Sequence, residues 1–235
     1  MKAISHYHTP ALAETALAEP LRKLYEIYDR IEKSQAGWIS ATPFRCPEGC
    51  GSCCDHFEPD ILDVEAYFLA SWLLIHQRDR IHSIPFDSDQ KGCILSDQNN
   101  PYHCTVYEGR PLICRLFAYS GDRGKDGSVR YRPCKFMKSD SVSSHTGKTY
   151  SAQELQELFG TLPPVMGDLA GEAAMLLPER SGDRAPLREI LPVALAKIQY
   201  ILDLAAFSAQ ARQNDPDGNN DGDNDNDGAP LPRAS

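Results

Sequence analysis

The sequence predicts an α+β protein, mainly helical, with its helices packed around a cysteine-rich insert of loops and short β-hairpins. Three observations predict this fold class. Apolar residues recur at helical spacing in the segments 11–34, 60–76 and 186–210. All eight cysteines fall in the window 46–134. Apart from the helical segment 60–76, that window consists of short strand-like pieces and turns rich in Gly, Pro and Asn.

The segment 11–34 is the first predicted helix. Pro20 is tolerated in a first turn, and Gly37 is expected to end the helix. One face carries apolar residues at 3.6-residue spacing: Leu21, Leu24, Tyr25, Tyr28 and Ile31.

The segment 60–76 is the second predicted helix, with Asp60 and Asp63 at the positive end of its dipole. Its apolar residues lie on nearly all sides of the helix, so we expect it to be the central, buried helix. We expect it to pack against the helices 11–34 and 187–210. Those apolar residues are Tyr67, Phe68, Leu69, Trp72, Leu73, Leu74 and Ile75.

The cysteine-rich window is predicted to hold loops and short strands. The block 46–54 is rich in Gly and Pro and is expected to be a loop. Residues 93–95 and 104–107 look like strands on either side of a turn at 99–101. Pro111 is expected to open a single helical turn.

A hairpin and one more helix complete the prediction, beside the final helix 186–210. The glycine-containing stretch 121–127 is predicted to be a hairpin loop between strands at 116–119 and 129–131. Ser151 and Glu154 match a capping box, which predicts a helix to about Phe159. We divide the chain into an N-terminal helical segment, the cysteine-cluster domain, C-terminal helices on the same core and a disordered acidic tail: 1–45, 46–138, 139–212 and 213–235.

Bulk properties limit the partners and the compartment. The 235 residues carry a net charge of −9 and no basic run, which argues against nucleic-acid or anionic-membrane binding. The N-terminus lacks the apolar core of a secretory signal, and the apolar stretch 66–75 is about half a membrane span. We therefore expect a soluble, cytoplasmic protein. In that compartment disulfides are rare, and clustered cysteines are more often metal ligands.

The first four cysteines lie within nine residues, at positions 46, 50, 53 and 54. Gly49 and Gly51 make the intervening turns easy, so several of these thiolates can reach one metal. The side chains of the adjacent Cys53 and Cys54 are expected to diverge. Cys54 then serves a second site or closes a cluster from another side.

Eight thiolates fit two four-cysteine sites, which suit either zinc or an iron–sulfur cluster, most simply a four-iron cluster. Cys114 near a helix start is expected to have a lowered pKa. The predicted metal ligands are Cys46, Cys50, Cys53, Cys54, Cys93, Cys104, Cys114 and Cys134. Basic residues near them that could offset the thiolate charge are Arg45, Arg110, Arg115, Arg132 and Lys135.

Three other interpretations of the cysteines were weighed. Structural disulfides conflict with the missing export signal, and unliganded core thiols would not cluster in this way. The spacing Cys46-x3-Cys50-x2-Cys53 is that of radical S-adenosylmethionine enzymes. Ser52 stands where that motif carries an aromatic residue, and the chain lacks the βα alternation of the barrel.

The ordered pattern of cysteines resembles a known family. The block Cys46 to Cys54 precedes an Asp-containing apolar helix and Cys93-Ile-Leu. Residues 104–115 then read Cys-Thr-Val-Tyr-Glu-Gly-Arg-Pro-Leu-Ile-Cys-Arg. Over about 40–138, this resembles the bacterial YkgJ-type cysteine-cluster family, described as a zinc- or iron-chelating domain. The resemblance implies metal binding by the eight cysteines and no settled reaction.

Flagellin lysine N-methylases look similar in the cysteine block. The alternative is therefore an iron–sulfur enzyme that carries out methyl transfer or redox chemistry. The chain is short for such an enzyme and has no Gly-x-Gly nucleotide loop, and no catalytic base or nucleophile stands out.

A few other residues are secondary candidates. His56, His103 and Asp55 adjoin the cysteines and could replace a thiolate or support one. Arg110 and Arg115 could contact sulfur or an anion, or could form ordinary surface ion pairs. The tail 217–228 twice matches the start of a calcium loop but lacks the closing glutamate, which favours a solvated acidic tail.

Overall fold

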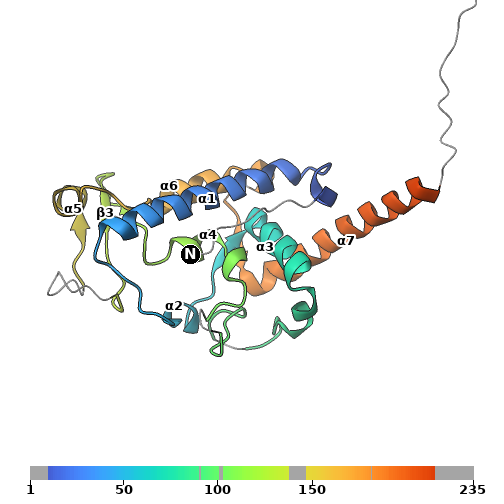
Figure 1. The fold of residues 1–235 in the computed structure, drawn as a ribbon, viewed down its shortest axis with the longest axis horizontal. Helices are drawn as coiled ribbons and strands as arrows, with labels where there is room; N and C mark the ends of the chain where they lie inside the picture. The colour runs from blue at the N-terminus through green and yellow to red at the C-terminus, as the bar shows by residue number, and fades with distance from the viewer. Residues whose placement is uncertain (1–9, 90, 101–102, 138–146, 181, 215–235) are drawn as a thin grey trace, which may run out of the picture.

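The computed structural model describes residues 10–89, 91–100, 103–137, 147–180 and 182–214. It is an α+β fold, mainly helical, with two small sheets (Figure 1). The α-helices are α1 (Ala18–Ala41), α2 (Ser52–Asp55), α3 (Asp63–His76), α4 (Leu112–Leu116), α5 (Ala152–Phe159), α6 (Met166–Ala174) and α7 (Leu187–Asn214). The strands are β1 (Asp60–Leu62), β2 (Asp122–Arg123), β3 (Val129–Tyr131), β4 (Tyr150–Ser151) and β5 (Arg184–Pro186). Four 3₁₀ turns are Pro10–Leu12, Arg78–Ser83, Tyr107–Gly109 and Pro178–Arg180.

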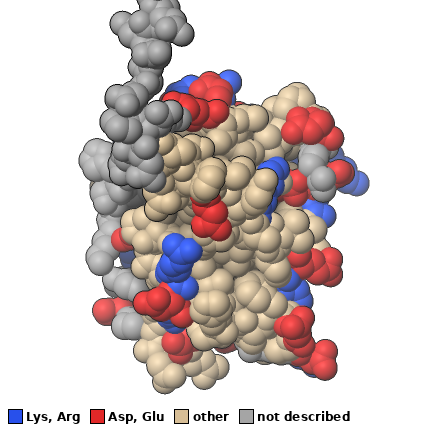
Figure 2. Space-filling view, turned by 90° about the vertical axis from the view of Figure 1, so that its right-hand side faces the viewer, with Lys and Arg blue, Asp and Glu red and all other residues tan. Residues whose placement is uncertain are grey.

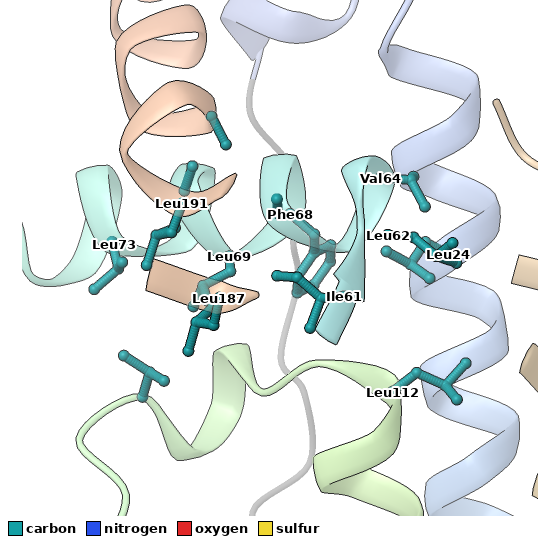
Figure 3. Close-up of a cluster of buried hydrophobic side chains, with 14 of the residues drawn as sticks. Leu24, Ile61, Leu62, Val64, Phe68, Leu69, Leu73, Leu112, Leu187 and Leu191 are labelled. Atoms are coloured by element: carbon teal, nitrogen blue, oxygen red, sulfur yellow. The ribbon is translucent and has the colours of Figure 1, made fainter. Parts of the chain in front are cut away.

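Helix α3 is central, as its all-round apolar sequence predicts. Phe68 and Leu69 are fully buried, and Phe68 meets the ring of Tyr28 on α1 edge-on at 5.1 Å between ring centroids. The other side of α3 packs against Leu187 and Leu191 of α7 (Figure 3). The predicted packing of α3 between α1 and α7 is confirmed.

Helix α1 differs from its prediction at both ends. It begins at Ala18, after a separate 3₁₀ turn, and it runs through Gly37 to Ala41. A glycine inside a helix costs about 1 kcal/mol relative to alanine. The buried indole of Trp38 packs on the rings of Phe44 and Tyr131, and burying a large aromatic side chain outweighs that cost.

The start of the predicted helix 60–76 is a strand. Residues Asp60–Leu62 form β1, which pairs antiparallel with β5 and places Ile61 opposite Ala185. Both strands lead directly into helices, so this short sheet fixes the starts of α3 and α7 side by side. The sequence analysis missed β5 because three residues carry too little periodicity to reveal a strand.

The second sheet has the order β2-β3-β4. The hairpin around 124–128 is confirmed, but its first strand is β2, because 116–119 is the end of α4 and a turn. The capping box of α5 is confirmed, with Glu154 N donating to Ser151 Oγ at 3.2 Å and Ser151 N donating to Glu154 Oε2 at 2.8 Å. Helix α6 was not predicted.

Strands were also predicted for 93–95 and 104–107, and this prediction is wrong. A single bridge between Ser96 and Cys104 joins these segments, and Tyr107 begins a 3₁₀ turn. Pro101 of the predicted turn lies outside the described residues, while the helical turn opened by Pro111 is confirmed as α4.

The buried apolar side chains form two separate cores. The first core is mostly aliphatic and joins α1, α3, α4 and α7 (Figure 3). The second core lies at the other end of α1, around the β2-β3-β4 sheet. Its buried members are Trp38, Phe44, Tyr131, Met137, Tyr150 and Leu155.

Helix α7 is longer than predicted and partly free of the body. Its residues Leu187–Ala211 are long and apolar enough, by length and composition alone, to cross a bilayer, although Leu187, Leu191 and Ile198 are buried in the first core. A stretch of this length and hydropathy was not predicted from the sequence. The predicted disordered tail, with its calcium-like motifs, lies from residue 215 onward outside the described residues.

Candidate metal centre

The first cysteine block folds as two tight turns. Cys50 N donates to Pro47 O at 3.2 Å, and Gly49 between them has φ +66°, which glycine adopts without strain. Cys54 N donates to Gly51 O at 2.7 Å, which starts the short helix α2. The block was predicted to be a loop throughout, so its last residues are a correction.

The adjacent cysteines do not diverge. The Sγ atoms of Cys53 and Cys54 lie 3.9 Å apart in the short helix α2. Two sulfurs bound to one tetrahedral zinc at about 2.3 Å each are separated by about 3.8 Å. The two sulfurs are therefore no farther apart than adjacent ligands in a metal centre, so the predicted divergence is wrong, while the assignment of Cys54 to a second site stays a prediction.

The main chain brings Cys93 and Cys104 to Cys54. Cys93 N donates to Cys54 O at 3.0 Å, and Cys104 is held by its bridge to Ser96. Gly92, at φ +85°, allows this approach, because a Cβ there would lie 2.5 Å from the carbonyl oxygen of Asp55. Cys54, Cys93 and Cys104 all pack against the first core.

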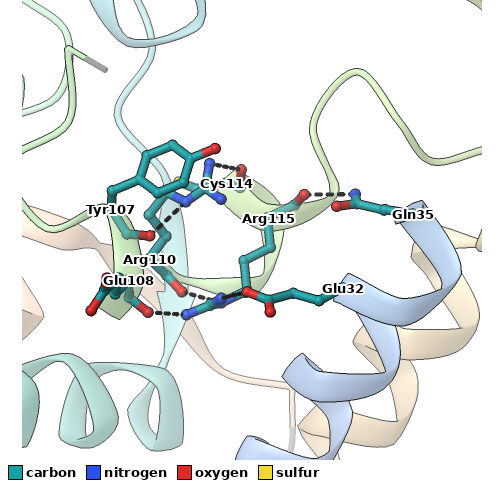
Figure 4. A network of polar contacts seen from close by, with 7 residues as sticks. All are labelled: Glu32, Gln35, Tyr107, Glu108, Arg110, Cys114 and Arg115. Carbon is teal, nitrogen blue, oxygen red and sulfur yellow. Dashed lines mark hydrogen bonds and ion pairs between the residues drawn. The ribbon is translucent and has the colours of Figure 1, made fainter. Parts of the chain in front are cut away.

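A buried arginine holds the helix that carries Cys114. The guanidinium of Arg115 donates to the carbonyl oxygens of Arg110, at 2.7 Å, and Glu108, and it lies 4.1 Å from the ring centroid of Tyr28 (Figure 4). Gln35 on α1 donates to the carbonyl oxygen of Arg115 at 2.7 Å. Arg115 is therefore a buried brace for α4, and it also forms an ion pair with the partly buried Glu32 of α1 at 3.5 Å.

Glu65 is a positioning residue that the sequence analysis missed. Its carboxylate is fully buried and accepts from Leu112 N, at 2.6 Å, and from Leu62 N, at 2.9 Å. It thereby joins the start of α3 to the start of α4. Burial raises its pKa, while these N–H donors and Arg184, 3.5 Å away, act in the opposite direction. An acidic residue in the first turn of an otherwise apolar helix was the available signal.

Arg110 is the basic residue placed to offset thiolate charge. Its guanidinium lies over the ring of Tyr107, 3.6 Å from the centroid, and donates to the carbonyl oxygens of Tyr107, at 2.9 Å, and Cys114, at 3.4 Å (Figure 4). Burial raises the pKa values of Cys104 and Cys114, and the positive charge of Arg110 acts against that rise; it also acts to lower the pKa of Cys53, after the larger effect of the Cys54 thiol.

The remaining cysteines connect to the second core. Cys46 N donates to Tyr119 Oη at 2.8 Å, and Cys134 packs with Tyr119 against that core. Cys46 and Cys53 are exposed, whereas Cys93 is buried. All eight cysteines are free thiols in the structure.

Burial and crowding keep most of these thiols protonated. Burial, followed by the neighbouring Cys50 and Cys134, raises the pKa of Cys46 to about 11. Burial raises the pKa of Cys93 to about 12 and also raises the pKa of Cys114, so the lowered value expected at a helix start is wrong. A hydrogen bond from the Cys54 thiol lowers the pKa of Cys53.

The electrostatic neighbours of the thiols form two sets that share Cys53, which acts on Cys54, Cys93 and Cys104 as well as on Cys46. The charges of Cys93 and Cys104 both act to raise the pKa values of Cys54 and of Cys114. Cys46 feels three other thiols: Cys50, Cys53 and Cys134. We name these sets the inner group (Cys54, Cys93, Cys104 and Cys114) and the outer group (Cys46, Cys50, Cys53 and Cys134). The groups adjoin at the Cys53–Cys54 pair.

His103 is the histidine that the fold brings to the thiols. Its ring lies against Gly51, where a Cβ would come within 2.2 Å of the imidazole Cγ. Its Nδ1 is buried and has no hydrogen-bond partner among the described residues. His56 and Asp55 are exposed instead.

The donor set suits a thiophilic metal. Within the described ranges, no three His, Cys, Asp or Glu side chains already surround a common point closely enough to hold an ion. The paired sulfurs of Cys53 and Cys54, the buried His103 nitrogen and the protonated, crowded thiols are nevertheless the features that a bound cation would stabilise.

These features define a cysteine-rich metal-binding domain. Residues 45–143 match the family model CxxCxxCC, described as "Putative zinc- or iron-chelating domain". The resemblance predicted from the cysteine pattern is confirmed over this segment, which contains all eight cysteines. No curated protein and no solved structure matches the chain.

Proposed function

We propose that this protein holds two metal ions, one in the inner group and one in the outer group of cysteines. The observation that carries the proposal is the attachment of the thiols to different cores. Cys54, Cys93 and Cys104 pack on the first core, whereas Cys134 packs on the second. Four thiolates around each metal would complete both sites from protein ligands alone.

Zinc is the ion that this arrangement favours. Four thiolates for each ion, with no open position, are the ligand set of a structural zinc site. A divalent cation would replace the protons that burial and crowding now keep on the thiols, and Arg110 would offset part of the remaining negative charge.

The proposed role is structural. Sites closed by four protein ligands leave no position for a substrate. Each metal would tie loops that carry little regular structure to a helical or a sheet-based core. A thiolate centre of this kind needs a reducing compartment, so a cytoplasmic location is part of the proposal.

An iron–sulfur protein is the second candidate, and the exposure of Cys46 and Cys53 favours it. A cluster near the surface can exchange electrons with a partner, and eight thiolates suffice for two four-iron clusters. This candidate retains the relation to flagellin lysine N-methylases as an enzymatic alternative.

Anaerobic purification followed by metal and sulfide analysis tests the proposal. Two equivalents of zinc in a colourless protein support it. Iron with acid-labile sulfide and visible absorbance would contradict the zinc proposal and support the iron–sulfur candidate. A protein without metal, with its cysteines oxidised in pairs, would overturn both.

Single substitutions test the division into two groups. Cys114→Ser in the inner group and Cys134→Ser in the outer group should each lower the metal content by about one equivalent and leave the other site filled. His56→Ala, at an exposed residue beside the cysteines, is the control and should keep both metals. Loss of all metal from both serine variants would contradict two independent sites and indicate one shared centre.

A further inference from the structure

The two halves of α7 have different surroundings. Leu187, Leu191 and Ile198 in the first half are buried against the body of the protein. The second half extends away from the body (Figure 1). Large apolar side chains are nevertheless exposed along the helix: Val193 at 66%, Tyr200 at 64%, Leu204 at 48% and Phe207 at 70%.

These exposed side chains form one straight stripe. Positions 193, 197, 200, 204 and 207 alternate in steps of four and three, which is the spacing of a helix–helix seam. At 1.5 Å per residue, the stripe from Val193 to Phe207 is about 21 Å long. The face of the protein seen toward this end of α7 has broad areas without charge (Figure 2).

An open groove continues the stripe onto the body. It has a volume of about 440 Å³ and lies beside the first half of α7. Tyr67, Ile190, Val193 and Ala194 line the part of it next to α7, and its rim carries the charged residues Asp63, Asp183, Arg184 and Glu189. A groove of this kind accepts a helix that presents a large apolar side chain.

We propose that the stripe is the interface for a second copy of this chain, with the two α7 helices antiparallel about a twofold axis at Tyr200. In this register, Val193 and the groove face Phe207 of the partner. Lys197 faces Asp203 of the partner, and the same pair recurs across the axis. Two apolar contacts and two opposite-charge contacts then form from a single self-complementary face.

A lipid bilayer fits the same helix less well. Crossing it with Leu187–Ala211 would pull Leu187, Leu191 and Ile198 out of the first core. Ile201 and Leu202 still pack on the first core, so only about 203–214 leaves the body, and its length of about 18 Å is shorter than a hydrocarbon core of about 30 Å.

Sedimentation equilibrium of the full-length, metal-loaded protein tests the proposal. The wild-type chain should dimerise, and Phe207→Glu should raise the dimer dissociation constant at least about tenfold, because the charge would be buried against the partner's groove. Leu158→Glu is the matched control, since Leu158 is 58% exposed on α5, away from the stripe. A monomeric wild-type protein, or equal weakening by both variants, would overturn the proposal.

A charge exchange tests the antiparallel register. Asp203→Lys should weaken dimerisation by placing two lysines opposite each other, and the double variant Lys197→Asp/Asp203→Lys should restore it. Lys197 also donates to Tyr67 Oη at 2.9 Å, so Tyr67→Phe serves as the control for losing that contact. Failure of the double variant to recover association would exclude this register. Co-flotation of the wild-type protein with phosphatidylcholine–phosphatidylglycerol vesicles as a monomer would instead assign the stripe to a membrane.

Discussion

The first and second cores support the cysteines in different ways. The first core is mostly aliphatic and gathers buried residues from Leu12 to Ile198, so it depends on contacts between distant parts of the chain. The second core is small and mostly aromatic, and its buried members come from residues 38–155. Cys93 is buried beside the first core, whereas Cys46, tied to the second core through Tyr119, is exposed.

This difference indicates how each part of the proposed centre would respond to damage. Loops fixed by a buried, long-range core open only when the whole domain unfolds. Loops fixed by a small core at the end of one helix can open locally. We therefore expect the outer group to lose and regain its metal more readily than the inner group.

The largest effect is expected from Phe68→Ala in the first core. Phe68 is fully buried between α1 and α7, and truncating such a ring costs about 4 kcal/mol of unfolding free energy. Chemical denaturation of the metal-loaded protein should show this loss in a single transition that also releases both metals. Leu158→Ala, at an exposed site on α5, should change the unfolding free energy by less than about 0.5 kcal/mol.

Phe44→Ala should have a somewhat smaller and more local effect. The ring of Phe44 contacts Tyr131, Tyr150 and Phe159 at centroid distances of 5.3, 5.7 and 5.6 Å. We expect a loss of about 3 kcal/mol, confined to the second core. Hydrogen exchange should accelerate in β3, β4 and α5 but not in α3. Equal acceleration in α3 would show that the two cores unfold as one unit.

Glu65→Gln should be next in size. Both carboxylate oxygens accept a backbone N–H, and glutamine keeps only one acceptor, so one buried donor loses its partner. We expect a loss of about 2 kcal/mol of unfolding free energy and weaker metal retention in the inner group, which contains Cys114 on α4. Glu157→Gln on the exposed face of α5 is the matched control. Unchanged metal retention in the inner group would contradict the role of Glu65 in positioning α4.

The smallest effect is expected from Asp168→Asn. Arg123 on β2 donates to both carboxylate oxygens of Asp168 on α6, at 2.8 and 2.6 Å, and this contact lowers the pKa of the carboxyl below its usual 3.8. A lowered folded-state pKa stabilises the protein above pH 3.8, and that contribution is lost as the pH falls through the folded value. Thermal melts at neutral pH should give a slightly lower melting temperature for Asp168→Asn than for the wild type. Added salt should abolish this difference, because the pair is exposed. A decrease that persists in high salt would contradict a purely electrostatic contribution.

Local patterns explain which elements were predicted. The apolar periodicity of 21–31 and 60–76 and the capping box at Ser151 specify helices through near neighbours. The strands β1 and β5 were missed because each has three residues and exists only through pairing with the other. The end of α1 was wrongly predicted at Gly37, because packing in a distant aromatic core decides where that helix ends.

By itself, the sequence determined the helical fold class, the cysteine-cluster family and the soft-metal chemistry of the domain, since these depend on residue types and on spacings of a few positions. The tertiary structure decided the rest. It brought the sulfurs of Cys53 and Cys54 within 3.9 Å of each other, buried Arg115 and Glu65 as braces for α4, and attached the cysteines to two different cores. These outcomes depend on contacts between residues far apart in the chain, whose burial and hydrogen bonds no local pattern specifies.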